Sequence, residues 1–404
     1  MTPEALRVDD PVRVMDGNKA AAYGVLLCRP DLLASYPISP QTPLLEQLYK
    51  FRAEGRLDTE TVEVEGENSA LSAAVGAVAA GGRAFTATSS MGLMFMYDAY
   101  LYASGQRVPV VMSVATREQC APHTVSSGQQ DIMMVKEGGW IQLIAESCQE
   151  ILDSILVAYR LAEDPNVQVP VNVCYDGYYL SHLSEPVYVP RQEAADRFLA
   201  AVNGGKRPVL STETPLTFGA FVLGDLYAEY RYKHCQAMQR ALDLLEALDG
   251  EFLAAFGREC GGSIEAYRTE DAEVLLVGTG SACGTLKVAI DRMRETGLSA
   301  GLARIRMFRP FPRRRLAELM RGKRAIGVLD RSVCFGWNGG HLFVDVKATA
   351  ADLAERVPIV NFIGGLAGSD VRREMLEDAV RRTVARGRGE PGPEVVWLGL
   401  EGAP

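Results

Sequence analysis

The chain has 404 residues, of which 48% are hydrophobic and 23% are charged, and its formal net charge is -9. This length exceeds what one hydrophobic core usually serves, so we expect two domains joined by connecting segments. No stretch approaches the roughly 18 uninterrupted apolar residues of a membrane span, and the acidic balance offers no basic surface to a nucleic-acid backbone, so we expect neither partner.

Short apolar runs rich in Val, Ala and Ser alternate with longer helical patterns from about residue 12 to residue 190. This alternation is typical of a doubly wound α/β domain, in which helices cover both faces of a parallel sheet. The helix after Glu67 contains almost only small residues and has Asn68 or Ser69 to cap it, so we expect it to be buried against another domain or subunit. Five strands are predicted, at Leu33–Pro37, Thr61–Glu65, Ala84–Thr88, Val108–Val114 and Val167–Cys174.

The alternation stops after residue 190, where Arg191–Asn203 and Thr217–Ala255 are predicted as long helices around a Gly-Gly-Lys-Arg-Pro turn. A second α/β unit begins near residue 265, and Arg386–Pro393 is predicted as a surface extension because it is dense in Arg, Gly and Pro. The expected division is therefore 1–200, 201–265, 266–385 and 386–404. The strands predicted for the second unit are Glu273–Val277, Ala300–Met307, Ala325–Asp330 and Pro358–Ile363.

The eight cysteines are scattered without a C-x-x-C pair, and the chain has only four histidines. Iron–sulfur clusters and structural zinc sites use closely spaced ligands, so we expect this chain to hold no metal by itself. The first six residues lack the basic and apolar regions of a signal peptide. Together these features predict a reducing, cytoplasmic location.

Three acidic residues, Glu63, Glu65 and Glu67, lie at the end of one predicted strand. A solvated edge is the simplest interpretation. Small residues follow Glu67 at once, however, so its carboxylate is expected to enter a packed junction at the carboxyl end of a parallel strand, where doubly wound sheets bind ligands. Burial there would raise the pKa of the carboxyl group and suit it to share a proton.

Arg117 and Ser39 also fall just past the ends of predicted strands. A guanidinium group and a hydroxyl group together are suited to a small carboxylate substrate. Arg and Ser at the start of a loop are also ordinary surface features, so these residues alone support only a weak prediction of an acid-binding site.

Two further patterns have a simpler interpretation than the catalytic one. Gly278–Gly284 follows a strand and opens a helix, but its spacing is G-x-G-x-x-x-G. The next strand ends Arg304-Ile-Arg306-Met307-Phe308 and not in an acid, which favours a plain turn over a dinucleotide site. Cys120 and His123 are three residues apart, but catalytic Cys–His pairs meet through the fold, and nothing nearby supplies a third, orienting group.

Five segments carry distinctive motifs in a fixed order, and they are Tyr36–Pro43, Val64–Leu71, Ala84–Leu93, Gly139–Leu143 and Asn361–Leu366. Together they resemble the alpha subunit of the 2-oxoacid:acceptor oxidoreductases, the family of pyruvate:ferredoxin oxidoreductase, over roughly residues 12–375. The first three correspond to the family segments Y-P-I-T-P, E-S-E-H-S-A-L and T-F-T-A-T-S-S-Q-G-L. Several motifs in one order are far more specific than any single one.

The resemblance implies a domain that binds the pyrimidine of thiamine diphosphate, followed by a transketolase C-terminal-like domain. It implies that Glu67 bonds the ring nitrogen N1′ of the cofactor, with Ile38, Ser90 and Met91 also at the cofactor. The implied reaction is the oxidative decarboxylation of a 2-oxoacid to its acyl-CoA, with thiamine diphosphate as the electron sink.

The resemblance also assigns residues to the substrate. Arg117 matches the family arginine that lies five residues before a proline, here Pro122, and faces the substrate carboxylate. Ser39 takes the place of the usual threonine, and Asp131 falls in register with the same region.

The usual magnesium–diphosphate segment, Gly-Asp-Gly followed by Asn, does not occur in this sequence. The resemblance therefore implies a beta subunit that binds the diphosphate and magnesium, a gamma subunit, a ferredoxin-like iron–sulfur subunit, and an electron acceptor that is ferredoxin or, through a coupling subunit, NAD. A hetero-oligomer built as a dimer of protomers is expected. The isolated chain should be inactive.

The sequence departs from the family pattern beside the expected substrate. Ser126–Gln130 replaces the more usual W-G-D-H-S, Gln119 and Cys120 replace Leu-Ser, and Asn68 replaces His. Loss of the bulky aromatic residue near Arg117 predicts a roomier pocket, for a branched or aryl 2-oxoacid in preference to pyruvate.

Three other functions fit parts of the sequence. A thiamine-dependent 2-oxoacid dehydrogenase subunit would pass its acyl group to lipoyl domains, although the position of the Tyr36 segment ahead of Glu67 favours the oxidoreductase. A scaffold subunit would keep the fold without activity. A nucleotide-binding dehydrogenase would use Gly278–Gly284.

Overall fold

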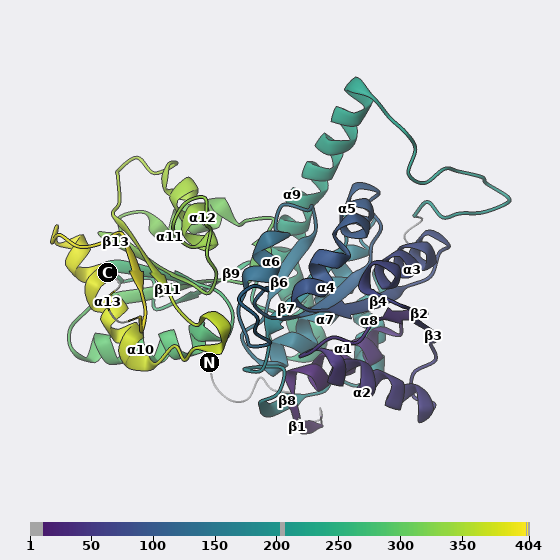
Figure 1. Cartoon of the computed structure of the whole chain (residues 1–404), viewed down its shortest axis with the longest axis horizontal. Coiled ribbons are helices and arrows are strands. Elements are labelled where there is room, and N and C mark those ends of the chain that lie inside the picture. Colours follow the sequence, from purple (N-terminus) through teal and green to yellow (C-terminus); the bar gives the residue numbers. More distant parts are fainter. Residues whose placement is uncertain (1–10, 203–206, 401, 403–404) are drawn as a thin grey trace.

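The computed structural model describes residues 11–202, 207–400 and 402, and in them two α/β units lie side by side (Figure 1). The expected lack of a signal peptide rests on the first six residues, and the expected turn between two helices rests on Gly-Gly-Lys-Arg-Pro. The first six residues and most of this turn lie outside the described residues. None of the described helices combines the length and the apolar character that a membrane crossing requires.

The first unit is built on a seven-stranded sheet with the order β12-β6-β7-β5-β4-β2-β3. All its neighbouring strands are parallel except β12, which pairs antiparallel with β6. The doubly wound prediction is confirmed, and each of the five predicted strands is present. The strands are β2 (Leu32–Ser35), β3 (Glu60–Glu63), β4 (Ala84–Thr88), β5 (Val111–Thr116), β6 (Ile141–Ile144), β7 (Val171–Asp176) and β12 (Met307–Arg309).

Proline sets the start of two strands that were predicted a few residues too early. β5 begins at Val111, after Pro109, and β7 begins at Val171, directly after Pro170. Proline has no N–H group and cannot donate to the ladder of a central strand, so pairing begins beyond it.

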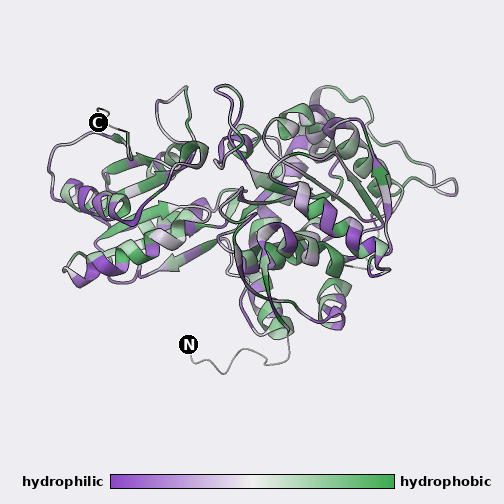
Figure 2. Cartoon of the chain, turned by 60° about the horizontal axis from the view of Figure 1, so that its bottom comes forward, coloured by the Kyte–Doolittle hydropathy of each residue, from purple (hydrophilic) through white to green (hydrophobic). Residues whose placement is uncertain are grey.

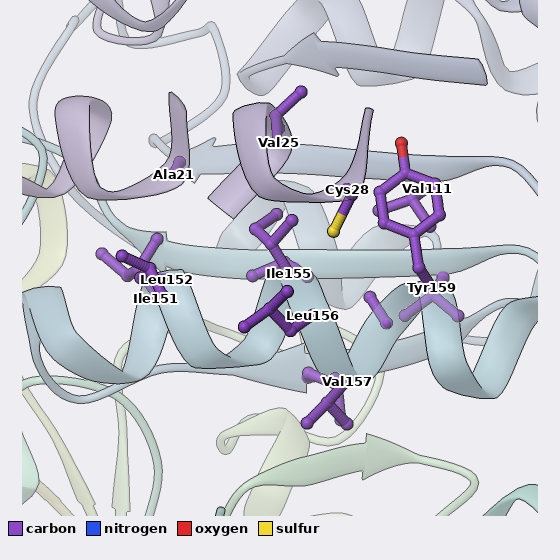
Figure 3. Packing of buried hydrophobic residues seen from close by; sticks show 14 of the residues in the cluster. Ala21, Val25, Cys28, Val111, Ile151, Leu152, Ile155, Leu156, Val157 and Tyr159 are labelled. Atoms are coloured by element: carbon purple, nitrogen blue, oxygen red, sulfur yellow. The ribbon is translucent and has the colours of Figure 1, made fainter. Parts of the chain in front are cut away.

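Two groups of helices cover the faces of the first sheet. On one face α1 (Gly17–Cys28), α2 (Thr42–Ala53) and α7 (Cys148–Ala162) share a core with the sheet, and Figure 3 shows Ala21, Val25 and Cys28 of α1 above the apolar side chains of α7. Close contact requires a small residue, because a Cβ on Gly24 would lie 2.8 Å from Cβ of Ile155. The other face carries α3 (Glu67–Ala79), α4 (Ser90–Phe95), α5 (Tyr97–Gly105) and α6 (Gln130–Met134).

A two-stranded antiparallel ribbon, β1 (Val12–Asp16) with β8 (Ser184–Tyr188), flanks this sheet. After α8 (Gln192–Ala200), the predicted helix Thr217–Ala255 begins later than expected, because α9 covers Gly224–Phe256. The first ten residues of α9 are exposed, and they extend beyond the body of the domain together with the loop before them (Figure 1).

The second unit contains a six-stranded sheet with the order β15-β14-β13-β10-β11-β9, in which only β9 is antiparallel to its neighbour. Helices α10 (Ala282–Glu295) and α13 (Arg373–Gly387) pack on one face, and α11 (Arg313–Met320) and α12 (His341–Ala350) pack on the other. A short 3-10 turn, η2 (Leu366–Gly368), precedes α13. The strands are β9 (Ile264–Tyr267), β10 (Val274–Gly278), β11 (Ala300–Ile305), β13 (Ala325–Asp330), β14 (Ile359–Ile363) and β15 (Val395–Trp397).

The prediction of one strand at Ala300–Met307 is wrong, because this extended run serves both sheets. β11 ends at Ile305 in the second sheet, and β12 begins at Met307 and pairs with β6 in the first. One apolar core then continues from the first sheet into the second, and in Figure 2 the strands of both are coloured mainly as hydrophobic. Alternation of apolar residues does not reveal such a change of sheet.

Buried ion pairs join the two units at the same place. Glu150, in the first turn of α7, pairs with Arg304 at 3.0 Å and also with Arg306. Arg304 is further paired with Glu146 at 2.9 Å. Arg304 lies near the end of β11 and Arg306 directly follows the strand, where a dinucleotide-binding strand would carry an acid.

The predicted surface extension Arg386–Pro393 is exposed from residue 388 to residue 393. The chain then returns to the protein, because β15 pairs in parallel with β14. β15 has only three residues, and only Val396 among them is buried. Such a short run cannot be recognised as a strand from the sequence.

Candidate functional site

The polar residues predicted for the site gather where the parallel strands of the first sheet end. Ser39 follows β2, Glu67 opens α3 shortly after β3, Ser90 follows β4 and Arg117 follows β5. The carboxyl ends of parallel strands face the same way, and in open α/β sheets ligands bind at that edge.

Asp131 holds two of these loops together. Its side chain is fully buried, and its carboxylate accepts hydrogen bonds from the backbone N–H groups of Ser90 at 2.9 Å, Arg117 at 3.0 Å and Ile132 at 2.8 Å. Burial raises the pKa of Asp131 to about 7, although these three N–H groups act in the opposite direction. The sequence predicts contact of Asp131 with substrate, whereas in the structure both carboxylate oxygens serve the backbone.

Ser90 has a positive φ of 46° in the left-handed region, and its hydroxyl donates to the carbonyl of Glu118 at 2.6 Å. A non-glycine residue needs local support in this region, which the N–H bond to Asp131 provides. Ser90 is therefore fixed between the loops after β4 and β5. Next to it, Met91 is 42% exposed.

Arg117 and Ser39 are brought together, but through the backbone of Ser39. The guanidinium Nη1 of Arg117 donates to the carbonyl of Ser39 at 3.0 Å, and its Nε donates to the carbonyl of Thr124 at 3.3 Å. Arg117 is only 8% exposed, whereas Ser39 is exposed and Ile38 is half-buried. The arginine is thus held in place with its charge unpaired by any described carboxylate side chain.

Glu67 differs from the two acidic residues before it. Glu63 and Glu65 are exposed, and Glu65 accepts a hydrogen bond from the Ser69 hydroxyl at 2.6 Å, whereas Glu67 is 7% exposed. Within the described part of the chain, the Glu67 carboxylate has no hydrogen bond or ion pair to another side chain. A buried carboxylate without a protein partner is suited to a polar ligand atom.

The carboxylate of Glu67 faces a surface of α4 that has no side chain. A Cβ on Gly92 would lie 2.5 Å from Oε1 of Glu67 and 2.5 Å from Oγ1 of Thr88. Oγ1 of Thr88 is buried and has no hydrogen-bond partner among the described residues. Glycine at position 92 thus keeps open a small polar recess beside these two oxygens, which is too narrow for a Cβ.

Residues of the second unit hold the loop that follows β5 through hydrogen bonds. The backbone N–H of Gln129 donates to the carbonyl of Arg331 at 3.0 Å, and the side-chain amide of Gln130 bonds both backbone groups of Val333. Arg331 Nη2 donates to the Ser127 hydroxyl at 2.9 Å. The loop after β5 therefore depends on the second unit for its conformation.

The loop Gly278–Gly284 receives a carboxylate of the protein itself. Asp176, at the end of β7, accepts from the backbone N–H of Ser281 at 2.8 Å and pairs with Arg331 at 2.7 Å. Gly280 has a φ of +72°, and a Cβ there would lie 2.6 Å from Nε2 of Gln129. The turn at the start of α10 thus docks the two units, at the position where a nucleotide loop would hold phosphate.

The structure also brings Cys120 and His123 together, with Sγ and Nδ1 3.1 Å apart on an exposed loop. Among the described residues no third side chain hydrogen-bonds to His123, so an orienting group is lacking. No group of three or more His, Cys, Asp or Glu side chains in the described residues is placed to share a metal ion.

Sequence reasoning missed Thr88, Gly92 and Asp176 as members of this region. Thr88 and Gly92 lie inside the motif Ala84–Leu93, but nothing in their spacing shows that they face Glu67. Asp176 lies two residues beyond the predicted strand Val167–Cys174, and an acid just past a strand end was the available signal.

Comparison with known proteins gives matches along most of the chain. Residues 23–248 match a family described as pyruvate flavodoxin/ferredoxin oxidoreductase, thiamine diP-bdg, and residues 272–376 match pyruvate:ferredoxin oxidoreductase core domain II. The chain is 39% identical to the NADH-dependent phenylglyoxylate dehydrogenase subunit alpha of Aromatoleum evansii, over 96% of this chain and 94% of that one. It is 40% identical to the pyruvate synthase subunit PorA of Methanosarcina barkeri, over 92% of each chain.

Two solved structures share the fold. The 2-oxoglutarate:ferredoxin oxidoreductase from Magnetococcus marinus, with 2-oxoglutarate, coenzyme A and succinyl-CoA bound, matches with a TM-score of 0.73 and 20% identity over 93% of this chain, which spans 66% of that chain. A split-gene transketolase, an inactive beta4 tetramer, matches with a TM-score of 0.52 and 12% identity, over 92% of this chain and 99% of that one.

Proposed function

Because the chain belongs to the alpha subunits of the pyruvate and 2-oxoacid:ferredoxin oxidoreductase family, we propose that Glu67 activates the pyrimidine half of a thiamine diphosphate site that a partner subunit completes. The observation that carries this proposal is the carboxylate of Glu67, which is buried beside the recess at Gly92 and has no side-chain partner among the described residues. When bound, thiamine diphosphate supplies the carbon nucleophile and electron sink for decarboxylation of the 2-oxoacid.

Glu67 holds a proton at one carboxyl oxygen and shares it with the ring nitrogen N1′. The start of α3 fixes the backbone of this residue, and the close approach of Gly92 leaves no room for a side chain at that position beside the carboxylate. Proton sharing of this kind requires the two heavy atoms to lie within hydrogen-bond reach. Ile38, Ser90 and Met91 line the same edge and are proposed to contact the cofactor.

Arg117 binds the substrate carboxylate through the part of its guanidinium fork that the carbonyls of Ser39 and Thr124 leave free. Two backbone acceptors orient the fork without neutralising it, so its full charge remains for an anionic ligand. Ser39 is exposed beside it and can donate its hydroxyl to the same carboxylate. Asp131 holds Arg117 through the backbone N–H of that residue.

The chain lacks a magnesium–diphosphate segment, so we assign diphosphate and magnesium to a beta subunit. Iron–sulfur clusters lie in partner subunits, which include a gamma and a ferredoxin-like subunit, and the acyl group leaves on coenzyme A. Electrons reach ferredoxin, or NAD through a coupling subunit. The complex is a cytoplasmic dimer of such protomers.

Replacement of Glu67 by Gln in the assembled complex should lower kcat by at least about 100-fold, the usual contribution of general acid–base catalysis. Glu63→Gln is the matched control, because it makes the same change on an exposed residue of the same chain segment and should leave kcat unchanged. Full activity of the Glu67 variant would show that this chain is a scaffold.

We further propose a branched or aryl 2-oxoacid as substrate in preference to pyruvate. Ser126 and its neighbours place no aromatic ring beside Arg117, although Glu118 and Arg331 occupy part of the space next to Gly128 and Ser127. The whole complex should turn over phenylglyoxylate or 2-oxoisovalerate with a higher kcat/KM than pyruvate. A higher kcat/KM for pyruvate than for both would overturn this assignment.

A further inference from the structure

Thr88 has a buried side chain whose hydroxyl makes no hydrogen bond within the described part of the chain. It is the last residue of β4, it is 0% exposed, and its Oγ1 has no hydrogen-bond partner among the described residues. A buried donor left without a partner costs about 1–3 kcal/mol. Such a group at the edge of a site is available to a partner that forms when the site is in use.

The carboxylate of Glu67 borders the same recess as the hydroxyl of Thr88. Oε1 of Glu67 and Oγ1 of Thr88 each lie 2.5 Å from the point that a Cβ on Gly92 would occupy. The two atoms therefore face the same small space from two different elements. Glu67 is itself without a side-chain partner in the described residues. Two buried groups, one a donor and one an acceptor, thus share a recess that only glycine keeps open.

We propose that Thr88 is a positioning residue for Glu67, whose hydroxyl donates a hydrogen bond to the Glu67 carboxylate across the recess when the aminopyrimidine is bound. This inference rests on the proposed function of Glu67. The bond holds one carboxyl oxygen as an acceptor, so the other oxygen keeps the proton directed at the ring nitrogen. Without it the orientation of the carboxylate is less restricted, and fewer molecules hold the proton in the required direction.

The chain offers a matched control for this role. Thr86 lies two residues earlier on β4, so its side chain points to the same face of the sheet. It is also 0% exposed, and its hydroxyl also lacks a partner in the described residues, but Oγ1 of Thr86 is not among the atoms nearest to the Cβ position on Gly92. Thr86→Val and Thr88→Val make the same chemical change in the same strand.

The test uses the assembled complex loaded with thiamine diphosphate. The primary readout is the rate at which the bound cofactor exchanges its C2 proton for deuterium, measured by acid quench and NMR, and the others are cofactor affinity, kcat and KM. Thr88→Val should slow the exchange by about tenfold or more, the effect of losing one hydrogen bond to a charged group. KM for the 2-oxoacid should stay near that of the wild type, Thr88→Ser should restore exchange to within about threefold, and Thr86→Val should match the wild type.

Several outcomes would overturn the inference. Exchange at the wild-type rate in Thr88→Val, with slow exchange in Glu67→Gln, rejects the role of Thr88 and leaves that of Glu67 intact. Equal slowing in Thr86→Val and Thr88→Val shows that the effect is general to β4. If Thr88→Val does not assemble, Thr88→Ala and Thr88→Ser replace it, and equal exchange rates in those two reject the role. Wild-type exchange in Glu67→Gln instead rejects the proposed function itself.

Discussion

At the scale of single residues, the site depends on buried carboxylates that differ in what they bond. Glu67 has no side-chain partner among the described residues, whereas Asp131 uses both oxygens for backbone N–H groups. The same chemical group, a carboxylate, is thus left without a side-chain partner in the described residues at one position and links two loops at the other, and its neighbours decide which.

Asp131→Asn should weaken the link between Ser90 and Arg117. An amide presents N–H donors to N–H donors, so at least one hydrogen bond is lost, at a cost of about 1–3 kcal/mol. Hydrogen–deuterium exchange of the peptides that carry Ser90 and Arg117, measured on the complex at pH 6, should be faster in the variant. Asp330→Asn is the control, because that buried carboxylate bonds the N–H groups of Leu342 and Phe343 in the other unit.

The difference in hydrogen–deuterium exchange between the wild type and Asp131→Asn should depend on pH in a defined direction. The pKa of Asp131 is raised from 3.8 to about 7 in the folded protein, so its contribution to stability is fully present below about pH 3.8 and is lost as the pH rises through 7. The protection that Asp131→Asn removes should therefore be larger at pH 6 than at pH 8, after correction for intrinsic exchange rates. Equal differences at both pH values would contradict the assignment.

At the scale of elements, the sequence predicts strands best where they are long and apolar. Ala84–Thr88 and Ala325–Asp330 are found with the predicted bounds. β6 has four residues and β15 has three, and runs this short carry little periodicity. Their places are set by neighbouring strands, which no local pattern records.

The turn Gly278–Gly284 illustrates the same limit. Its residues indicate a tight strand-to-helix connection with an open helix N-terminus, and β10 and α10 are present as expected. The anion at that helix terminus is Asp176, more than 100 residues earlier in the chain. Only the packing of the two units brings these residues together.

At the scale of the whole molecule, the two units are held together by charge as well as by the shared core. Burial alone would raise the pKa of Glu150, but Arg304 and Arg306 outweigh it and lower this pKa from 4.5 to about 2. The ion pairs therefore contribute stability above about pH 4.5, and this contribution is lost as the pH falls toward 2.

Glu150→Gln should leave two buried arginines without their main partner and destabilise the protein by about 3–5 kcal/mol at pH 7. Thermal unfolding of the complex should show a lower midpoint, and the loss of stability between pH 4.5 and pH 3 should be smaller than in the wild type. Glu54→Gln breaks exposed pairs with Lys50 and Arg56, and its effect should stay below about 1 kcal/mol. Similar midpoints for the two variants would contradict the role of the ion pairs.

The sequence by itself determined the fold class, the order of most strands and helices, the family and the candidate residues Glu67 and Arg117, because periodicity and ordered motifs are local properties of the chain. Tertiary structure alone decided that β12 crosses into the first sheet, that Asp176 fills the turn before α10, and that Thr88 and Gly92 face Glu67. These relations join residues far apart in the chain, and they depend on how the layers pack against one another.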